Sequence, residues 1–344
     1  MLRDEVLALL KAREGKPLSG EEMSRALGVS RAAVWKAMES LRDEGYVISS
    51  APRRGYALES SPDKLSAGEL AGALAGRRVG RALVCLETVD STNDEVKRRA
   101  LAGAADGLAV VAERPGGGGG AGAVGAERQT GGRGRRGRSF VSPAGQGLYL
   151  SVLLRPRCPL EEVSALTAWT AVAVCSAVER VCGVRPGIKW PNDVILDGRK
   201  LCGILTELEL EAETAALRHV VVGVGINLTQ TAADFGPEVA PVAVSLAQAL
   251  GRAPRRAEMA AAVLVALDEL YAAFPAERAA WLERYRADCL TLGRTVRLLR
   301  AGGEEEAFAE AVDDTFALVV RRADGSREAV SSGEVSVRGL LGYV

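Results

Sequence analysis

Two segments of the sequence concentrate the residue types that handle phosphate chemistry. The first is Pro115–Arg138, in which residues 116–137 hold 11 glycines in 22 positions and residues 128–138 hold five arginines and no acid. So much glycine disfavours a helix or strand, and a loop of cations suits an anionic ligand such as a phosphate. The second is Lys189–Asp193, with the sequence Lys-Trp-Pro-Asn-Asp, which leads into a hairpin that carries Lys200. Both segments predict a site for a phosphorylated ligand.

Three interpretations of the Arg/Gly loop compete. Gly132, Gly134 and Gly137 have the spacing of a dinucleotide-binding fingerprint, but that motif opens a helix, whereas Ser139–Pro143 leads into an apolar strand. An Arg/Gly tract can also bind RNA as a disordered tail, but this one lies between two strands of a folded domain. We therefore favour a loop that orders when a nucleotide binds.

Polar residues and glycines also follow two predicted strands. Ser91-Thr92-Asn93 either caps the next helix, expected over Glu95–Ala100, or hydrogen-bonds a small polar ligand. Gly223-Val224-Gly225-Ile226-Asn227 ends another strand and allows close approach to the backbone. Both segments are candidates for the same binding site.

The strand Lys200–Leu208 carries a cation and a glycine. Period-2 alternation predicts Lys200, Cys202 and Ile204 on one face and Gly203 on the other. A lone lysine on a strand is often a solvated edge charge, but the neighbouring loop and the Lys-Trp-Pro-Asn-Asp turn favour a ligand-binding role.

Residues 1–58 have the pattern of a winged helix-turn-helix. A helix is expected over Leu2–Ala12, a capping box over Ser19–Glu22 opens a second, and Ser30 caps a third that runs from Arg31 to about Glu44. A hairpin with a basic tip follows. The DNA-binding candidates are Ser30, Arg31, Ala32, Lys36, Arg53 and Arg54.

The middle of the chain mixes strands and helices. A capping box over Ser66–Glu69 is expected to start it. The strands are expected at Ala82–Glu87, Leu108–Ala112, Leu148–Leu154, Val194–Leu196, Lys200–Leu208 and His219–Gly225, and the helices at Leu160–Cys182, Ala257–Phe274 and Pro275–Cys289. Asp197-Gly198 predicts a type I′ hairpin. This pattern indicates an α/β (α+β) fold with a mixed sheet.

The last part of the chain predicts a small β-barrel. Its short strands are expected at Val296–Leu299, Ala307–Val312, Ala317–Arg321, Glu328–Ser331 and Glu334–Val337.

Composition excludes several classes of protein. The 44 Lys and Arg balance 44 Asp and Glu, so the chain is not a generally basic nucleic-acid coat protein. A single histidine, His219, argues against histidine-rich metal clusters, and the six cysteines contain no C-x-x-C pair, which favours reduced thiols in the cytoplasm. The longest apolar run, Val163–Val178, is shorter than the roughly 20 residues that span a bilayer, so we expect no membrane partner.

These motifs together resemble, in order along nearly the whole chain, the biotin protein ligase family. They are Ser91–Asn93, Gln129–Arg138, Lys189–Asp193, Arg199–Gly203 and Gly223–Asn227. The N-terminal winged helix and the C-terminal Gly333–Arg338 make the chain similar to the bifunctional members, the biotin operon repressors. The resemblance implies a ligase core, a C-terminal SH3-like β-barrel, and the domains 1–62, 63–291 and 292–344.

The resemblance also implies the reaction and its substrates. Biotin and ATP, with Mg²⁺, give biotinyl-5′-AMP, and a lysine of a biotin carboxyl carrier protein takes the biotinyl group. Operator DNA is the implied second partner, and a homodimer is implied when biotinyl-5′-AMP is bound. The alternatives are a DNA-binding, small-molecule-sensing regulator without ligase activity, and a lipoate or octanoate ligase-like enzyme.

The family's functional residues map onto this sequence by position. The implied catalytic residues are Lys200, Arg135 and Asp193, and Asp193 would position either Mg²⁺ or the acceptor lysine. The implied biotin-binding residues are Ser91, Thr92, Asn93, Gln129, Arg133, Gly134, Arg135, Lys200, Gly203 and Gly223. The implied ATP- or adenylate-binding residues are Arg133, Arg135, Arg136, Arg138, Phe140, Lys189, Asn192 and Asn227.

The sequence departs from the family pattern at two places. Phe140 stands where the family more often has a tryptophan that stacks on adenine. Pro115–Gly125 is inserted before the Arg/Gly motif, and Ala126-Glu127-Arg128 repeats Ala112-Glu113-Arg114, so the sequence leaves open which copy ends the strand. Extra loop length costs little free energy, so we expect activity to survive the insertion.

Overall fold

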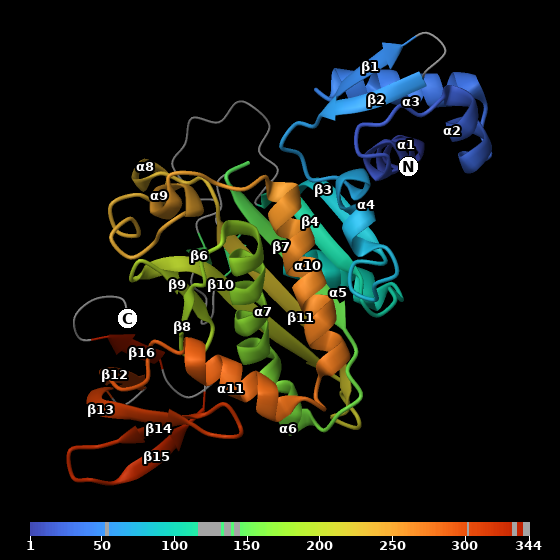
Figure 1. Cartoon of the computed structure of the whole chain (residues 1–344). Coiled ribbons are helices and arrows are strands. Elements are labelled where there is room, and N and C mark those ends of the chain that lie inside the picture. Colours follow the sequence, from blue (N-terminus) through green and yellow to red (C-terminus); the bar gives the residue numbers. More distant parts are fainter. Residues whose placement is uncertain are drawn as a thin grey trace, which may run out of the picture.

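The computed structural model describes residues 1–51, 55–115, 132–133, 139–140, 145–300, 303–331 and 336–339. An N-terminal helical unit lies at one end of a central sheet and a small C-terminal sheet lies at the other (Figure 1). The order of these units along the chain is the one expected from the sequence.

The N-terminal unit is a winged helix-turn-helix. Its elements are α1 (Leu2–Ala12), α2 (Gly20–Leu27), α3 (Arg31–Asp43), β1 (Val47–Ala51) and β2 (Gly55–Ser60). Ser19 and Glu22 form the predicted capping box, and the Ser30 hydroxyl accepts a hydrogen bond from the Ala33 amide. The unit has its own apolar core, centred on residues such as Leu10, Met38 and Leu41. These local predictions are confirmed.

The winged helix packs directly on α4 (Ala67–Leu74), the first helix after the linker. A Cβ at Gly68 would lie 2.8 Å from the Asp4 carbonyl oxygen, so a glycine is required where α1 crosses α4. Ser66 caps α4 as predicted, but the predicted capping box is wrong in its second half. The buried Glu69 carboxylate instead binds Lys11 at 2.5 Å and Arg255 at 3.0 Å, which ties the winged helix to the core.

The central sheet has seven strands in the order β3-β4-β7-β11-β10-β9-β8. β3 and β4 are parallel and the other pairs are antiparallel, so the sheet is mixed as predicted. The strands are β3 (Leu83–Val89), β4 (Ala109–Pro115), β7 (Gly147–Leu154), β8 (Gly187–Lys189), β9 (Asp193–Leu196), β10 (Arg199–Leu210) and β11 (Leu217–Asn227). β4 contains the first Ala-Glu-Arg copy, which answers the question that the sequence left open.

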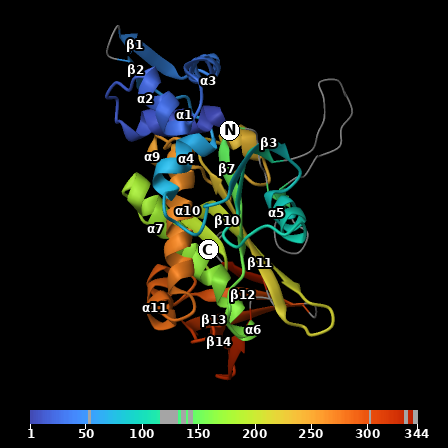
Figure 2. The same ribbon diagram turned by 90° about the vertical axis from the view of Figure 1, so that its right-hand side faces the viewer.

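Helices cover the sheet on both faces (Figure 2). On one face, α7 (Ala165–Cys182) and α10 (Arg256–Ala273) bury most of the apolar core. On the other face, α5 (Thr92–Leu101) packs its Val96 and Ala100 against Val110, Leu153 and Val221. Of the described helices, α5 is the one that packs on this second face, next to the strand ends that carry the candidate site residues.

Three predicted helix boundaries are wrong. The helix expected over Leu160–Cys182 is interrupted at Ser164, giving α6 (Leu160–Val163) before α7. α11 (Arg278–Asp288) begins three residues after the expected Pro275. α5 begins at Thr92 rather than Glu95, because the Ser91 hydroxyl already accepts a hydrogen bond from the Asp94 amide. Two short helices were not predicted, α8 (Ala232–Phe235) and α9 (Leu246–Leu250).

The C-terminal unit is a five-stranded antiparallel sheet with the strand order β15-β14-β13-β12-β16. Its strands are β12 (Thr295–Arg300), β13 (Gly303–Val312), β14 (Leu318–Arg321), β15 (Arg327–Val330) and β16 (Ser336–Gly339). The Trp190 indole donates a hydrogen bond to the Phe316 carbonyl at 3.0 Å, and Tyr285 meets the Phe316 ring edge to face. The C-terminal unit therefore anchors the Lys-Trp-Pro-Asn-Asp turn.

Among the described residues, one helical stretch is long and apolar enough to cross a membrane. It is Leu160–Cys182, and 72% of its most apolar window is buried inside the protein. A helix that buries its apolar surface against the sheet is behaving as a core helix.

Candidate functional site

The face of the sheet that carries α5 also carries a strip without side chains. In the strand register, Gly203 of β10 pairs with Gly225 of β11, and Gly223 lies two residues along β11 on the same face. We call these three positions the glycine strip. Gly203 and Gly225 place no side chain on this face of two neighbouring strands, while the space above Gly223 is taken by Asn93 of α5. A flat ligand can therefore approach that backbone closely.

The residues paired across the strands differ at the two ends of the glycine strip. The Gly223 row pairs with Ser151 on one side and Leu205 on the other. The Gly203 row continues through Asp193 to Lys189 on β8. Hydroxyl groups therefore flank one end of the glycine strip, and charged groups flank the other.

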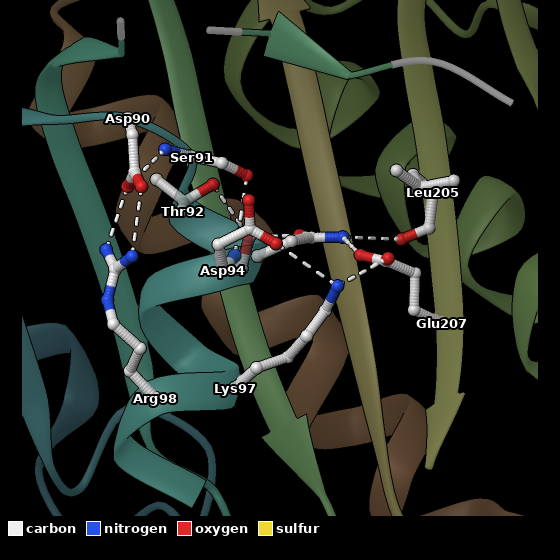
Figure 3. A network of polar contacts seen from close by, with 10 residues as sticks. Asp90, Ser91, Thr92, Asp94, Lys97, Arg98, Leu205 and Glu207 are labelled. Atoms are coloured by element: carbon white, nitrogen blue, oxygen red, sulfur yellow. Dashed lines mark hydrogen bonds and ion pairs between the residues drawn. The ribbon is translucent and has the colours of Figure 1, made fainter. Parts of the chain in front are cut away.

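A chain of hydrogen bonds forms the polar end (Figure 3). The Ser151 hydroxyl lies 2.7 Å from Thr92 Oγ1 and 2.5 Å from Asn93 Oδ1. Asn93 Nδ2 donates to Glu207 Oε2 at 2.6 Å. We call Thr92, Asn93, Ser151 and Glu207 the hydroxyl relay. A Cβ at Gly223 would lie 2.2 Å from Asn93 Oδ1, so the glycine is what allows Asn93 to reach the sheet.

Lys97 completes the polar end from the next turn of α5. Its amino group binds Glu207 at 2.6 Å and Asp94 at 3.2 Å. Partial burial would lower the pKa of Lys97, but the hydrogen bonds to Glu207 and Asp94 outweigh that and raise it. On the outer side of α5, Arg98 holds the Asp90 carboxylate with two hydrogen bonds and keeps the pKa of Asp90 far below its usual range.

The charged end is formed by Lys189, Asp193 and Lys200, which we call the cationic end. Lys200 Nζ lies 2.6 Å from Asp193 Oδ1. Lys189 is buried and is paired with Asp193 in the register, so their side chains project to the same face. Two lysines therefore lie beside one carboxylate here, and cations of this kind suit a phosphate or a carboxylate of a ligand.

The backbone of Lys200 is held on both sides. Its amide donates to the Val242 carbonyl at 2.8 Å, and its carbonyl accepts from the Val244 amide at 3.0 Å. Asn227 Nδ2 donates to the carbonyls of Lys200 and Val244. The sequence assigned Asn227 to ATP; the structure shows its carboxamide fixing the strand that carries Lys200.

The predicted alternation on β10 is wrong at Lys200. The register with β9 shifts between Lys200 and Cys202, so the period of two is interrupted there. Lys200 therefore binds Asp193, which pairs with Gly203, and its amino group reaches the face of the glycine strip rather than the opposite one. The Asp197-Gly198 hairpin next to it is as predicted, with positive φ at both residues.

Asn192 and Trp190 hold the turn rather than pointing outward. Asn192 Nδ2 donates to the Ile204 carbonyl at 2.7 Å, and the Trp190 amide donates to Thr291 Oγ1 at 2.9 Å. The predicted nucleotide-binding role of Asn192 stays a prediction, while its position beside the cationic end is observed.

Most of the Arg/Gly loop lies outside the residues that the structure describes. Gly132-Arg133 and Ser139-Phe140 form a short antiparallel pair, β5 and β6, so a strand, not a helix, follows Gly137 and the dinucleotide fingerprint is excluded. The predicted site residues Gln129, Gly134, Arg135, Arg136 and Arg138 lie outside the described residues, and so do Arg53 and Arg54 of the wing.

Sequence reasoning missed Ser151, Glu207 and Lys97. A signal existed for the first two: Ser151 is a small polar residue within the otherwise apolar run Leu150–Leu154 of β7, and Glu207 alternates with Gly203 and Leu205 on one face of β10. Lys97 lies one helical turn after Asn93, which is the spacing of side-chain neighbours.

The exposed face of α3 carries the predicted DNA-contacting residues. Arg31, Ala32 and Lys36 are exposed, and Trp35 beside them is 52% exposed. Val34 and Met38 of the same helix are buried in the winged-helix core. The helix thus presents cations and an aromatic ring outward from a fixed scaffold.

Each of the three units matches the model of a known protein family. Residues 3–57 match an HTH domain, residues 121–227 match the Biotin/lipoate A/B protein ligase family, and residues 291–338 match the Biotin protein ligase C terminal domain. The Bifunctional ligase/repressor BirA of Bacillus subtilis is 34% identical over 336 residues, which cover 96% of this chain and 97% of that protein. The protein of the same name from Escherichia coli is 30% identical over 335 residues, 97% of this chain and 96% of that one.

A solved structure matches three-quarters of the chain. The biotin protein ligase from Aquifex aeolicus in complex with biotin and ATP aligns with a TM-score of 0.61 at 28% identity, covering 75% of this chain and 99% of that one. The folds therefore agree over the whole length of that enzyme.

Proposed function

Because the chain belongs to the bifunctional biotin ligase/repressor family, we propose that it activates biotin with ATP and transfers it to a lysine of a biotin carboxyl carrier protein. The observation that carries this proposal is the glycine strip, with hydroxyl groups at one end and the Lys200–Asp193 pair at the other. Biotin has the matching form, a flat polar ring at one end and a carboxylate at the other.

The reaction has two steps. A biotin carboxylate oxygen attacks the α-phosphorus of ATP, and pyrophosphate leaves with the electrons of the broken P–O bond. The amino group of the carrier lysine then attacks the carbonyl carbon of biotinyl-5′-AMP; AMP leaves and the amine loses a proton. Both nucleophiles come from substrates, so this chain supplies binding, orientation and charge.

Lys200 is the residue that we assign to charge stabilisation. Negative charge gathers where the carboxylate meets the α-phosphate, and a fixed cation there is worth several kcal/mol. Asp193 holds the Lys200 amino group at 2.6 Å, and the segment around Val242 and Val244 holds its backbone. We assign Ser91, Thr92 and Gln129 to the ureido ring, and Arg133, Arg135, Arg136, Arg138 and Phe140 to the adenylate.

Mg²⁺ is expected to enter with ATP. Among the described residues no group of three or more His, Cys, Asp or Glu is arranged to hold a metal. Mg²⁺ is commonly bound through substrate phosphates and only one or two carboxylates, and Asp193 supplies such a carboxylate. When bound, the ion would neutralise phosphate charge at the cationic end.

The direct test is adenylate synthesis. Purified protein with biotin and [α-³²P]ATP should form labelled biotinyl-AMP, and adding a carrier domain should move biotin onto its lysine. Lipoate in place of biotin should give little product, because relatives that cover 74% and 61% of this chain are named biotin--[acetyl-CoA-carboxylase] ligases. Absence of adenylate would favour a regulator without ligase activity.

We further propose that the protein represses transcription as a homodimer in the cytoplasm. The winged helix carries ten Lys and Arg against eight Asp and Glu over residues 1–58, a net charge of only +2, so one copy should bind DNA weakly. Helix-turn-helix proteins gain affinity by pairing two half-sites. Biotinyl-AMP, more than biotin, should tighten dimerisation and DNA binding. Sedimentation with and without biotinyl-AMP tests this, and an unchanged monomer–dimer equilibrium would contradict it.

A further inference from the structure

The carboxylate of Glu207 fixes the direction of a hydrogen-bond chain. It accepts from Lys97 Nζ on one oxygen and from Asn93 Nδ2 on the other, each at 2.6 Å. A carboxylate only accepts hydrogen bonds, so the NH₂ group of Asn93 must face Glu207. The Leu205 carbonyl, 3.4 Å from the same nitrogen, is a second acceptor on that side.

The orientation of Asn93 then decides the next two bonds. Its Oδ1 faces Ser151, which lies 2.5 Å away and must donate its only hydroxyl proton there. Thr92 Oγ1, 2.7 Å from the same Ser151 oxygen, must therefore donate its own proton to Ser151. The Thr92 hydroxyl is left with lone pairs alone.

We infer that Glu207 is a positioning residue that makes Thr92 an obligate hydrogen-bond acceptor toward the ligand. Thr92 is half-buried at the start of α5, while Ser151 is fully buried. The inference rests on the proposed function, which places the ureido ring of biotin against Thr92. That ring has two N–H donors and one carbonyl acceptor, so Thr92 selects an N–H group.

Glu207→Gln should reverse this selection. In the parent, Lys97 and Asn93 each donate to one carboxylate oxygen of Glu207. A glutamine offers only one acceptor oxygen, and the charged Lys97 amino group should bind it more strongly than Asn93 does. The NH₂ group of the new side chain then faces Asn93, whose carboxamide turns over. Ser151 accepts from Asn93 and donates to Thr92, and the Thr92 proton points toward the ligand's N–H.

The test is a double-mutant cycle on biotin binding, measured by calorimetry on the full chain without ATP. Glu207→Gln should weaken biotin binding about three- to tenfold, the worth of one hydrogen bond. In a Thr92→Val background the same change should have an effect below about twofold, because the hydroxyl that it acts through is gone. Glu209→Gln, the same substitution on the exposed continuation of β10, is the matched control.

Ser151→Ala gives a second, independent variant that breaks the relay in its middle. It should weaken biotin binding in the parent and not in Thr92→Val, and it should raise the KM for biotin without changing kcat. Equal losses in both backgrounds, or no loss from Glu207→Gln, would overturn the inference. If the unmodified protein binds no biotin, the proposed function fails first, and the inference fails with it.

Discussion

Two lysine–carboxylate pairs of equal length lie on the same face of the sheet and have different surroundings. Lys97–Glu207 and Lys200–Asp193 both measure 2.6 Å, and both lysines are about three-quarters buried. Around Lys97, Asp94 and Glu207 supply two carboxylates for one cation. Around Asp193, Lys189 and Lys200 supply two cations for one carboxylate.

The difference shows that an ion pair has no function by itself. At the Lys97 end, the second carboxylate oxygen of Glu207 accepts a hydrogen bond from Asn93 and so orients that side chain. At the Lys200 end, two lysines lie beside one carboxylate, an arrangement that suits the proposed anionic ligand. In the proposed binding mode, the neutral ring of biotin lies at the Lys97 end of the glycine strip and its carboxylate at the Lys200 end.

The largest effect should come from Lys200→Ala. We expect adenylate synthesis to fall by about 10²- to 10³-fold, because charge on the α-phosphate develops beside this cation. Biotin affinity should change far less, since the loss is confined to the transition state. Labelled-adenylate formation and calorimetry give the two numbers.

Lys97→Ala is the matched substitution at the other pair. It should leave the rate at saturating biotin within about twofold, because it removes no charge next to the phosphate. Equal losses of rate in Lys97→Ala and Lys200→Ala would contradict the different roles proposed for the two pairs. Equal losses of affinity and rate in Lys200→Ala would contradict a role for Lys200 confined to the transition state.

Arg135→Gly, in the Arg/Gly loop, should have the next largest effect. Losing one charge-assisted hydrogen bond to a buried phosphate costs ~1.5–3 kcal/mol, or roughly ten- to a hundredfold in adenylate retention. Biotinyl-AMP that escapes should label exposed lysines of bystander proteins. A variant that labels only the carrier domain would contradict the role proposed for Arg135.

Gly223→Ala should damage the polar end alone. The new Cβ would lie 2.2 Å from Asn93 Oδ1, so Asn93 must move and the relay must break. We expect a loss of about 1–3 kcal/mol in unfolding free energy from overpacking, with biotin affinity down about tenfold. Gly72→Ala in α4, where a Cβ has open space, is the control and should not destabilise the protein. Normal biotin affinity in Gly223→Ala would contradict the proposed relay.

Local chemistry in the sequence predicted much of the fold. Helix starts at Ser19 and Ser30 follow from cap residues whose partners are three positions away. The type I′ hairpin follows from Asp197-Gly198, which can both adopt positive φ. Each of these features is decided within a few residues, so a sequence shows it directly.

Features that depend on distant residues were missed or misjudged. The Glu69 carboxylate does not complete the predicted capping box. It binds Lys11 and Arg255, which lie 58 and 186 positions away in the sequence. The face on which Lys200 acts depends on a register shift against β9, which alternation does not reveal. Ser151 and Glu207 gain a role only because the sheet brings them to Asn93.

The smallest effect is a difference in alkaline stability between the protein and its Lys97→Met variant. Lys97 has a pKa raised above its ordinary value of 10.5 by Glu207 and Asp94, so the folded state holds this proton more tightly than the unfolded state does. The stabilisation is therefore complete below pH 10.5 and is lost as the pH rises through the raised value. Because the Lys97 side chain is 30% exposed, its worth should be below about 1 kcal/mol. From pH 9 to 11.5, the unfolding free energy measured with urea should fall more steeply in the parent than in Lys97→Met. If the two curves run parallel, Lys97 does not stabilise the fold through Glu207, and Glu207 is held in place by Asn93 and the sheet.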